Sequence, residues 1–180
     1  MRCSISGLSV PALEMILKLG ASLLLVVVAV AGCNTFGPPD IRPGQTVAEA
    51  SLRLGPNTGR YAMPGGVTRL EYATGPYGRT TWMVDIDAEG RVIAASQVLN
   101  EKNFAEFQGR ASGMSQDELL RTLGRPGERR HGGWQGGEVW SWRYPTNDCL
   151  WFRSSIGPDG RVRDGAYGID PTCDAPSDRN

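Results

Sequence analysis

The chain has 180 residues, with 19 basic and 19 acidic side chains and 40% hydrophobic content, enough apolar residues for a folded core. A formal net charge of zero excludes a typical nucleic-acid binder, because neutralising phosphates requires a surplus of Lys and Arg. The length suits one domain or two small domains packed together.

An apolar run stands near the start of the chain. Residues 19–31 are mainly Leu, Val and Ala, and Lys18 precedes them. A charged start followed by an apolar stretch is typical of a secretory signal peptide, and the run is shorter than the about 20 residues of a membrane-spanning helix. We expect translation to start at Met15, because Glu14 would lie in the charged region of the longer form.

The apolar run ends in Val30-Ala31-Gly32-Cys33, which resembles the lipobox of bacterial lipoproteins. We therefore expect residues 1–32 to be removed, Cys33 to be acylated, and residues 33–40 to tether the fold to the membrane. Asn34 follows the cysteine where Asp would favour the inner membrane, so the prediction is the periplasmic face of the outer membrane. The alternatives are a buried helix and a simple signal anchor.

Two motifs occur twice at a nearly constant spacing. Gly44-Gln45-Thr46 and Leu54-Gly55-Pro56 correspond to Gly113-Met114-Ser115 and Leu123-Gly124-Arg125-Pro126, each 69 residues further on. A turn ending at Gly90 recurs at Gly160, 70 residues later. This spacing predicts a duplicated structural unit.

The first unit is predicted over residues 41–98. Thr46 is a suitable N-cap, Gly55 and Pro56 end the helix, and the later segments alternate apolar with polar residues. The expected elements are a helix over 47–54 and strands over 67–72, 79–87 and 91–98.

The second unit is predicted over residues 99–175, followed by a disordered tail over 176–180. A short helix with Phe104 and Phe107 on one face opens the unit, and a capping box of Ser115 and Glu118 begins the next helix. The expected elements are helices near 100–107 and 115–123 and strands over 139–144, 150–156 and 161–167. The predicted fold class is therefore α+β, with two tandem units. In each unit, helical structure packs against a three-stranded antiparallel meander.

Two cysteines, Cys149 and Cys173, remain in the chain after Cys33. In an oxidising compartment this even pair predicts a disulfide that joins the C-terminal segment to the sheet. The alternatives are two free thiols or half of a metal site. A metal site is disfavoured because His131 is the single histidine, and no cofactor is expected.

The motifs of the second unit resemble a known family. Gly113-Met114-Ser115, the helix that ends in Leu123-Gly124-Arg125-Pro126, and Trp142-Arg143-Tyr144 are similar to the Gly-Met-Thr, Leu-Gly-x-Pro and aromatic strand of the SmpA/OmlA, or BamE-like, outer-membrane lipoproteins. The resemblance implies helices against an antiparallel sheet and a partner in the β-barrel assembly machinery. That family has one unit, and Gln45 stands where its Met is usual. A tandem pair also resembles the architecture of the β-lactamase inhibitor protein.

These features predict a lipid-anchored, non-enzymatic interaction module that supports β-barrel assembly or envelope integrity. Aromatic residues and Arg are common anchors of interfaces. For Trp140 and Trp142 a place in the core is the alternative to a role in binding, since they alternate with polar residues. For Trp134 a core position and a binding role are equally supported. The candidate partner-binding residues are Trp134, Trp151, Tyr77, Arg129 and Arg130.

Two other functions compete with this hypothesis. An inhibitor-like binding domain fits the tandem units, but a lipid anchor would restrict its targets to one membrane. A hydrolase would need a nucleophile and base within reach of each other, and no small-molecule substrate is expected. The candidates for such a role are isolated in sequence: His131 in a loop expected to be solvated, Ser154 and Ser155 in a strand, and Asp85 and Asp87 on a strand's solvent face.

Overall fold

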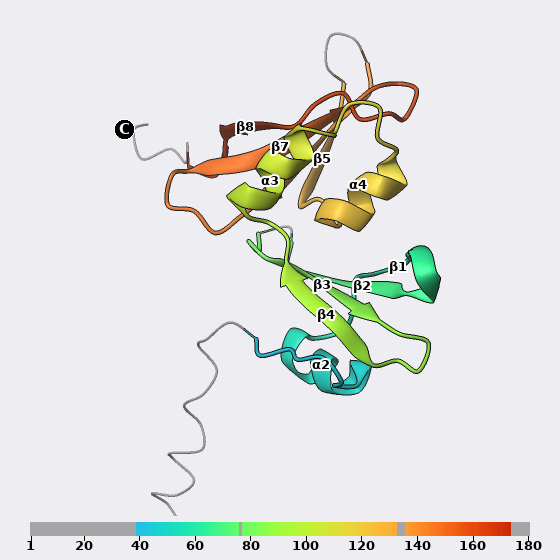
Figure 1. The fold of residues 1–180 in the computed structure, drawn as a ribbon. Helices are drawn as coiled ribbons and strands as arrows, with labels where there is room; N and C mark the ends of the chain where they lie inside the picture. Colours follow the sequence, from blue (N-terminus) through green and yellow to red (C-terminus); the bar gives the residue numbers. More distant parts are fainter. Residues whose placement is uncertain (1–38, 76, 133–135, 174–180) are drawn as a thin grey trace, which may run out of the picture. The chain divides into compact units, whose positions relative to one another are not determined.

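The computed structural model describes residues 39–75, 77–132 and 136–173 (Figure 1). The predicted signal peptide, the lipobox with Cys33, and the predicted tail over 176–180 lie outside the described residues. The described residues from Asp40 onward belong to one compact unit.

The described chain is an α+β protein with two antiparallel four-stranded sheets, which confirms the α+β part of the prediction. We call β1–β4 the first sheet and β5–β8 the second sheet, and in each sheet the strands lie in chain order. The elements are α2 (Val47–Leu54), β1 (Gly59–Ala62), the 3-10 helix η1 (Pro64–Gly66), β2 (Thr68–Ala73), β3 (Thr81–Ile86), β4 (Val92–Gln97), α3 (Glu101–Gln108), α4 (Gln116–Leu123), β5 (Glu128–His131), β6 (Glu138–Arg143), β7 (Leu150–Ile156) and β8 (Ala166–Ile169).

Each sheet has four strands where three were expected. The additional strands, β1 and β5, are short and carry little of the apolar alternation by which strands are recognised. His131, expected in a solvated loop, ends β5 and pairs with Glu138. The last strand also begins later than predicted, at Ala166, because Asp164 lies outside the ladder and accepts a hydrogen bond from Ser154 Oγ through its carbonyl.

The helices that open the two halves have the same capping boxes. Thr46 precedes α2, and its backbone N–H donates to Glu49 Oε2 at 2.7 Å. Ser115 precedes α4, and its N–H donates to Glu118 Oε2 at 2.8 Å. These backbone hydrogen bonds are the main reason that the pKa of both glutamates lies below the usual value. Each box satisfies backbone donors that the first helical turn leaves without partners.

The repeated glycines occupy equivalent places beside the two sheets. Gly44 N–H donates to the Val92 carbonyl, and Gly113 N–H donates to the Val162 carbonyl, each at 2.8 Å. Both glycines have a positive φ, 88° and 83°, which is why this residue recurs. Residues about 70 apart in sequence therefore occupy matching positions in the two halves.

Helix α2 packs on one face of the first sheet. Ala50 is fully buried against the inward side chains of the strands, and Ser51 Oγ lies 3.2 Å from the Tyr72 hydroxyl. Further apolar side chains, Trp82 among them, are partly buried at the margin. The buried members of this first core are Ala50, Leu70, Tyr72, Val84, Ile86 and Val92.

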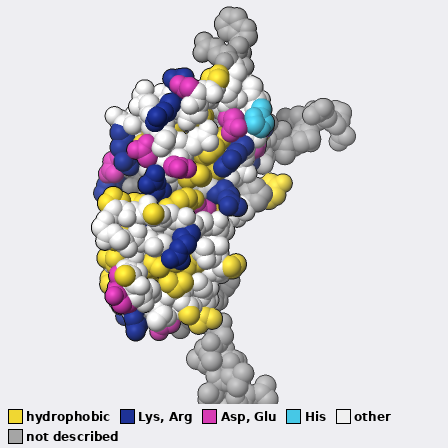
Figure 2. All heavy atoms as spheres, turned by 90° about the vertical axis from the view of Figure 1, so that its right-hand side faces the viewer, with side chains coloured by type: hydrophobic (Ala, Val, Ile, Leu, Met, Phe, Trp, Pro, Cys, Tyr) yellow, Lys and Arg dark blue, Asp and Glu magenta, His cyan; other side chains and the backbone are white. Residues whose placement is uncertain are grey.

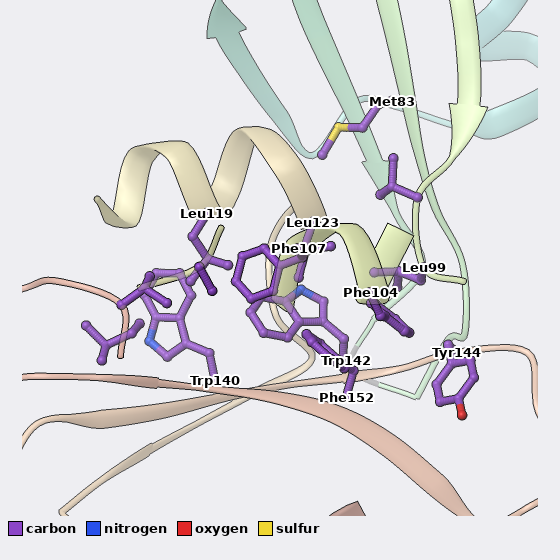
Figure 3. Close-up of a cluster of buried hydrophobic side chains, with 14 residues drawn as sticks. Met83, Leu99, Phe104, Phe107, Leu119, Leu123, Trp140, Trp142, Tyr144 and Phe152 are labelled. Atoms are coloured by element: carbon purple, nitrogen blue, oxygen red, sulfur yellow. The ribbon is translucent and has the colours of Figure 1, made fainter. Parts of the chain in front are cut away.

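Helices α3 and α4 pack together on one face of the second sheet (Figure 1). Figure 3 shows the aromatic centre of this second core, where the Phe104 and Phe152 rings stack with centroids 4.1 Å apart. Trp140 and Trp142 are buried, as the core alternative predicts, and Trp142 Nε1 donates to the Gly124 carbonyl at the end of α4. This core is larger and more aromatic than the first.

The end of α4 also contacts the other face of the first sheet. Arg69 Nη1 donates to the Arg121 carbonyl at 2.9 Å, and Met83 of the first sheet belongs to the second core. A Cβ on Gly124 would lie 2.7 Å from Thr81, so only glycine permits this approach. The first sheet is therefore covered on both faces, by α2 and by α4.

Candidate functional site

The structure brings three of the candidate partner-binding residues together around one arginine that the sequence did not single out. The Arg143 guanidinium carbon lies 5.8 Å from the ring centroid of Tyr77 and 5.3 Å from that of Trp151. The Arg130 guanidinium lies 6.0 Å from the same Trp151 ring. We call Tyr77, Arg143, Trp151 and Arg130 the cation–π ladder. Cations at these distances are attracted to the negative faces of aromatic rings.

A buried ion pair fixes the centre of the ladder. Arg143 donates to both carboxylate oxygens of Asp170, Nε to Oδ2 at 2.5 Å and Nη2 to Oδ1 at 2.9 Å. Burial, the largest influence, raises the pKa of Asp170, but hydrogen bonds from Arg143 and Thr172 together outweigh it and hold that pKa below the usual value. The bidentate geometry sets the orientation of the Arg143 plane between the two rings.

The predicted disulfide between Cys149 and Cys173 closes around the same ion pair. The two Cα atoms are 5.9 Å apart, and the Asp170 N–H donates to the Cys149 carbonyl at 2.9 Å. The crosslink joins the segment after β8 to the start of β7, as the sequence predicted. It therefore holds Asp170 in reach of Arg143.

The ladder lies on the side of the second sheet opposite α3 and α4. Arg143, Trp151 and Gly168 are directly paired across β6, β7 and β8, and Phe152, next to Trp151, points into the core. Both helices lie on the core side (Figure 1). The residues on the other side, from the strand register, are Glu128, Arg130, Val139, Ser141, Arg143, Trp151, Arg153, Ser155, Ala166 and Gly168.

Exposure differs sharply along the ladder. Tyr77 is 78% exposed, whereas Trp151 is 3% exposed among its neighbours. Trp151 Nε1 is a buried donor without a hydrogen-bond partner in the part of the chain that the structure describes. An unpaired buried N–H is costly and rare, so this atom needs an explanation.

The remaining candidate residues lie elsewhere. Arg129 faces the core side, where its guanidinium stacks 3.9 Å over the centroid of Trp140. This contact shields the margin of the second core. Trp134 lies outside the described residues.

The residues considered for catalysis do not converge. His131 is exposed, and its Nδ1 lies 3.4 Å from Glu138. Asp85 forms a bidentate ion pair with Arg69, with both distances 2.7 Å, while Asp87 accepts from the Arg91 N–H in a turn. Within the described ranges, no group of three or more His, Cys, Asp or Glu residues could hold a metal ion.

A cleft of about 530 Å³ is lined by residues of the first sheet and of α3 and α4, beside the place where the end of α4 contacts the sheet. Several of its charged groups already have partners, since Arg69 pairs with Asp85 and Glu118 closes the capping box. Its lining residues are Met63, Pro64, Arg69, Ser96, Val98, Asn103, Glu106, Arg110, Met114, Glu118, Arg121 and Thr122. The cleft therefore offers few convergent polar groups to a small ligand.

Charge is mixed over the surface. Figure 2 shows Lys and Arg side chains interspersed with Asp and Glu on the face that it draws. None of the helices in the described ranges is long and apolar enough to cross a membrane.

Sequence reasoning missed Arg143, Asp170 and Glu71. Arg143 and Trp151 share a face because they are paired across β6 and β7. The sequence does not show this pairing, because the loop between the two strands gives no indication of their register. Glu71 alternates with buried Leu70 and Tyr72, a pattern that predicts a solvent face, yet it is fully buried. Glu71 is enclosed where the end of α4 packs on the sheet, and it accepts hydrogen bonds from Thr58, Tyr61 and Arg125.

No protein-family model and no curated protein sequence matches this chain. Among solved structures, a cysteine-rich secretory protein from Staphylococcus aureus aligns with 72% of this chain and 44% of that protein, at 8% identity and a TM-score of 0.27. The chain thus spans less than half of that protein's length. A TM-score this low defines neither a shared fold nor a shared function.

Proposed function

We propose that the chain is a lipid-anchored interaction module of the periplasmic face of the outer membrane, with acylated Cys33 as its anchor. In this proposal it is an accessory in β-barrel outer-membrane protein assembly or in envelope integrity, and it acts without catalysis. The two halves are then tandem BamE-like units, each a helix packed on a meander. The lipobox, the repeated Gly and Leu-Gly-x-Pro motifs, and the matching capping boxes support this assignment.

The observation that carries the proposal is the cation–π ladder. Its exposed members are Tyr77 and Arg130, and buried Trp151 and Arg143 lie beneath them, with Arg143 oriented by a buried carboxylate. Exposed Tyr77 and Arg130 supply contact area at little entropic cost, because the buried side chains beneath them hold them in place. Such a surface is suited to a protein partner rather than to a small substrate.

Two measurements test the proposal. Mass spectrometry of the mature protein is expected to find an acylated N-terminal Cys33, and an unmodified chain that retains residues before Cys33 contradicts the anchor. A photo-crosslinking amino acid in place of Tyr77 is then expected to capture an envelope protein in cells. The matched control is Leu52, which is 87% exposed on α2 and far in sequence from the ladder. Equal capture from both positions, or none from either, contradicts the interaction surface.

A further inference from the structure

The last strand of the second sheet has one edge without a neighbouring strand. Among the described strands, β8 pairs with β7 alone (Figure 1). Just beyond β8, the Asp170 N–H donates to the Cys149 carbonyl, which precedes β7. Backbone groups in an antiparallel pair point alternately toward and away from the other strand, so the N–H and C=O of Tyr167 and Ile169 point away from β7. These four groups form no hydrogen bond with any other part of the described chain.

The equivalent edge of the first sheet is closed by the chain's own side chains. Gln97 at the end of β4 and Leu99 lie 70 residues before Tyr167 and Ile169 and hold the same places beside their sheet. The Leu99 N–H donates to Gln97 Oε1, and Gln97 Nε2 donates to the Leu99 carbonyl at 2.9 Å. Asn100 Nδ2 donates to the Gln97 carbonyl, also at 2.9 Å. Side chains thus satisfy at the first edge what stays unpaired at the second.

The side chains beside the free edge of β8 are apolar and exposed. Tyr167 is 38% exposed and Ile169 is 67% exposed. The Tyr167 ring contacts Phe104 of α3 with centroids 6.1 Å apart, and residues two apart in a strand share a face, so both side chains lie on the α3 side. An edge with free backbone groups and apolar side chains is a template for pairing with another strand.

A cation lies over the middle of the same edge, on the opposite face of the sheet. Arg153 pairs with Ala166 across β7 and β8, and a Cβ built on Gly168 would lie 2.7 Å from Arg153 Nε. Arg153 is exposed and forms no ion pair with any acid in the described residues. A strand added at the edge would place one side chain beside this guanidinium, and an acid there would complement its charge.

Two segments of this same chain fit the edge less well than a partner does. A second copy could pair its own β8 antiparallel about Gly168, but this would bring Arg153 of both copies together, and like charges on facing strands repel. The chain's residues 174–180 include Pro176 and no large apolar side chain. Neither segment supplies an acid between apolar side chains at alternate positions.

We infer that the free edge of β8 binds an extended segment of a protein partner as an added strand. The segment carries apolar side chains at alternate positions, which contact Tyr167 and Ile169, and an Asp or Glu between them, which pairs with Arg153. Its backbone supplies donors and acceptors to the free groups of the edge. This inference rests on the proposed function and names the form and chemistry of the partner segment.

The first test is site-specific photo-crosslinking in the cells that produce the full-length lipoprotein. The crosslinking amino acid replaces exposed Ala166 on β8, and the captured peptide is mapped by mass spectrometry. The expected peptide has apolar residues at alternate positions with an acid between them. Arg153→Glu is expected to lower the yield about tenfold or more. Arg60→Glu makes the same change of charge on the exposed edge strand β1 and is expected to leave the yield unchanged.

A second pair of variants tests the backbone pairing itself. Ile169→Pro removes an outward N–H and no hydrogen bond to β7, and proline is tolerated at such edge positions. Ile169→Ala, the matched control, removes the side chain and keeps the N–H. The proline variant is expected to lower the yield about tenfold more than the alanine variant. In the unsubstituted edge, hydrogen exchange of the Tyr167 and Ile169 amides is expected to be about tenfold slower or more in the crosslinked complex than in the free protein.

Several outcomes would overturn the inference. They are equal losses for the proline and alanine variants, equal losses for Arg153→Glu and Arg60→Glu, and unprotected amides in the complex. A mapped peptide without alternating apolar residues, or one from residues 174–180 or from a second copy of this chain, would overturn it too. Capture of a partner from Tyr77 without capture from Ala166 would overturn this inference and leave the proposed function standing.

Discussion

The first and second sheets share strand order and register, yet they differ in what covers them. The first sheet has α2 on one face and the end of α4 on the other, and its buried Glu71 receives the Arg125 N–H. The second sheet has α3 and α4 on one face and arginine with tryptophan on the other. Equivalent faces of the two sheets therefore lie in different environments and carry different polar residues.

The largest expected difference is in the unfolding free energy that a truncated aromatic side chain costs in each of the two cores. Phe152→Ala removes a ring that stacks on Phe104 in the second core and should cost about 3–5 kcal/mol of unfolding free energy. Trp82→Ala, 70 residues earlier at the margin of the first core, should cost less, because Trp82 is partly exposed. Urea denaturation followed by circular dichroism measures both. Equal losses would contradict the ranking of the two cores.

The second largest expected difference is in the unfolding free energy lost when each of the two Arg–Asp pairs is broken. Asp170→Asn breaks a buried pair and should cost about 3 kcal/mol, whereas Asp85→Asn, in a partly exposed pair with Arg69, should cost about 1 kcal/mol or less. The same denaturation experiment compares them. A larger loss for Asp85→Asn would show that burial does not control these pairs.

The pH dependence of stability sharpens the same comparison. The pKa of Asp170 is lower in the folded chain than the value of about 3.9 of an unfolded one. Its stabilising contribution is therefore complete above about pH 4 and is lost as the pH falls through the folded pKa. Asp170→Asn should therefore reduce the loss of unfolding free energy at acid pH. Denaturation between about pH 2 and about pH 7, the range in which carboxyl groups titrate, measures this effect. An unchanged acid slope would contradict the role of the Arg143 pair.

A smaller effect is expected from the acceptor under α4. Glu71 accepts from the Tyr61 hydroxyl, the Thr58 hydroxyl and the Arg125 N–H. Burial, and then the hydrogen bond to Glu71, raise the pKa of Tyr61 above its ordinary value. Glu71→Ala should cost about 1–3 kcal/mol, because buried donors lose their acceptor. Ser141→Ala, at the matching position of the second sheet, is the control and should cost less; the reverse order would contradict the comparison.

The helix caps are expected to behave alike in the two halves. Thr46→Ala and Ser115→Ala each remove a capping box of the same geometry and should each cost about 1 kcal/mol. Thermal unfolding of the two variants compares them directly. A clear difference between the two losses would show that tertiary contacts, rather than the caps, hold one of these helices.

Much of the local structure could be predicted because it depends on neighbouring residues. Thr46 with Glu49 and Ser115 with Glu118 lie three residues apart, and each pair begins its helix as the pattern indicates. The β1 and β5 strands were missed because they form at sheet edges from segments without strong alternation. Their position follows from the strands beside them, which a local pattern does not contain.

The sequence by itself predicted the α+β class and the capped helices, which follow from residue type and short-range spacing. It also predicted the pairing of Cys149 with Cys173, which follows from the even number of cysteines after Cys33. Tertiary structure decided which sheet faces are covered and where the candidate site lies. The contacts that decide this, Arg69 with Arg121 and Glu71 with Arg125, join residues 52 and 54 apart. Arg143 meets Tyr77 only through packing between the halves. A side chain's partner across such distances depends on register and packing, which no local pattern encodes.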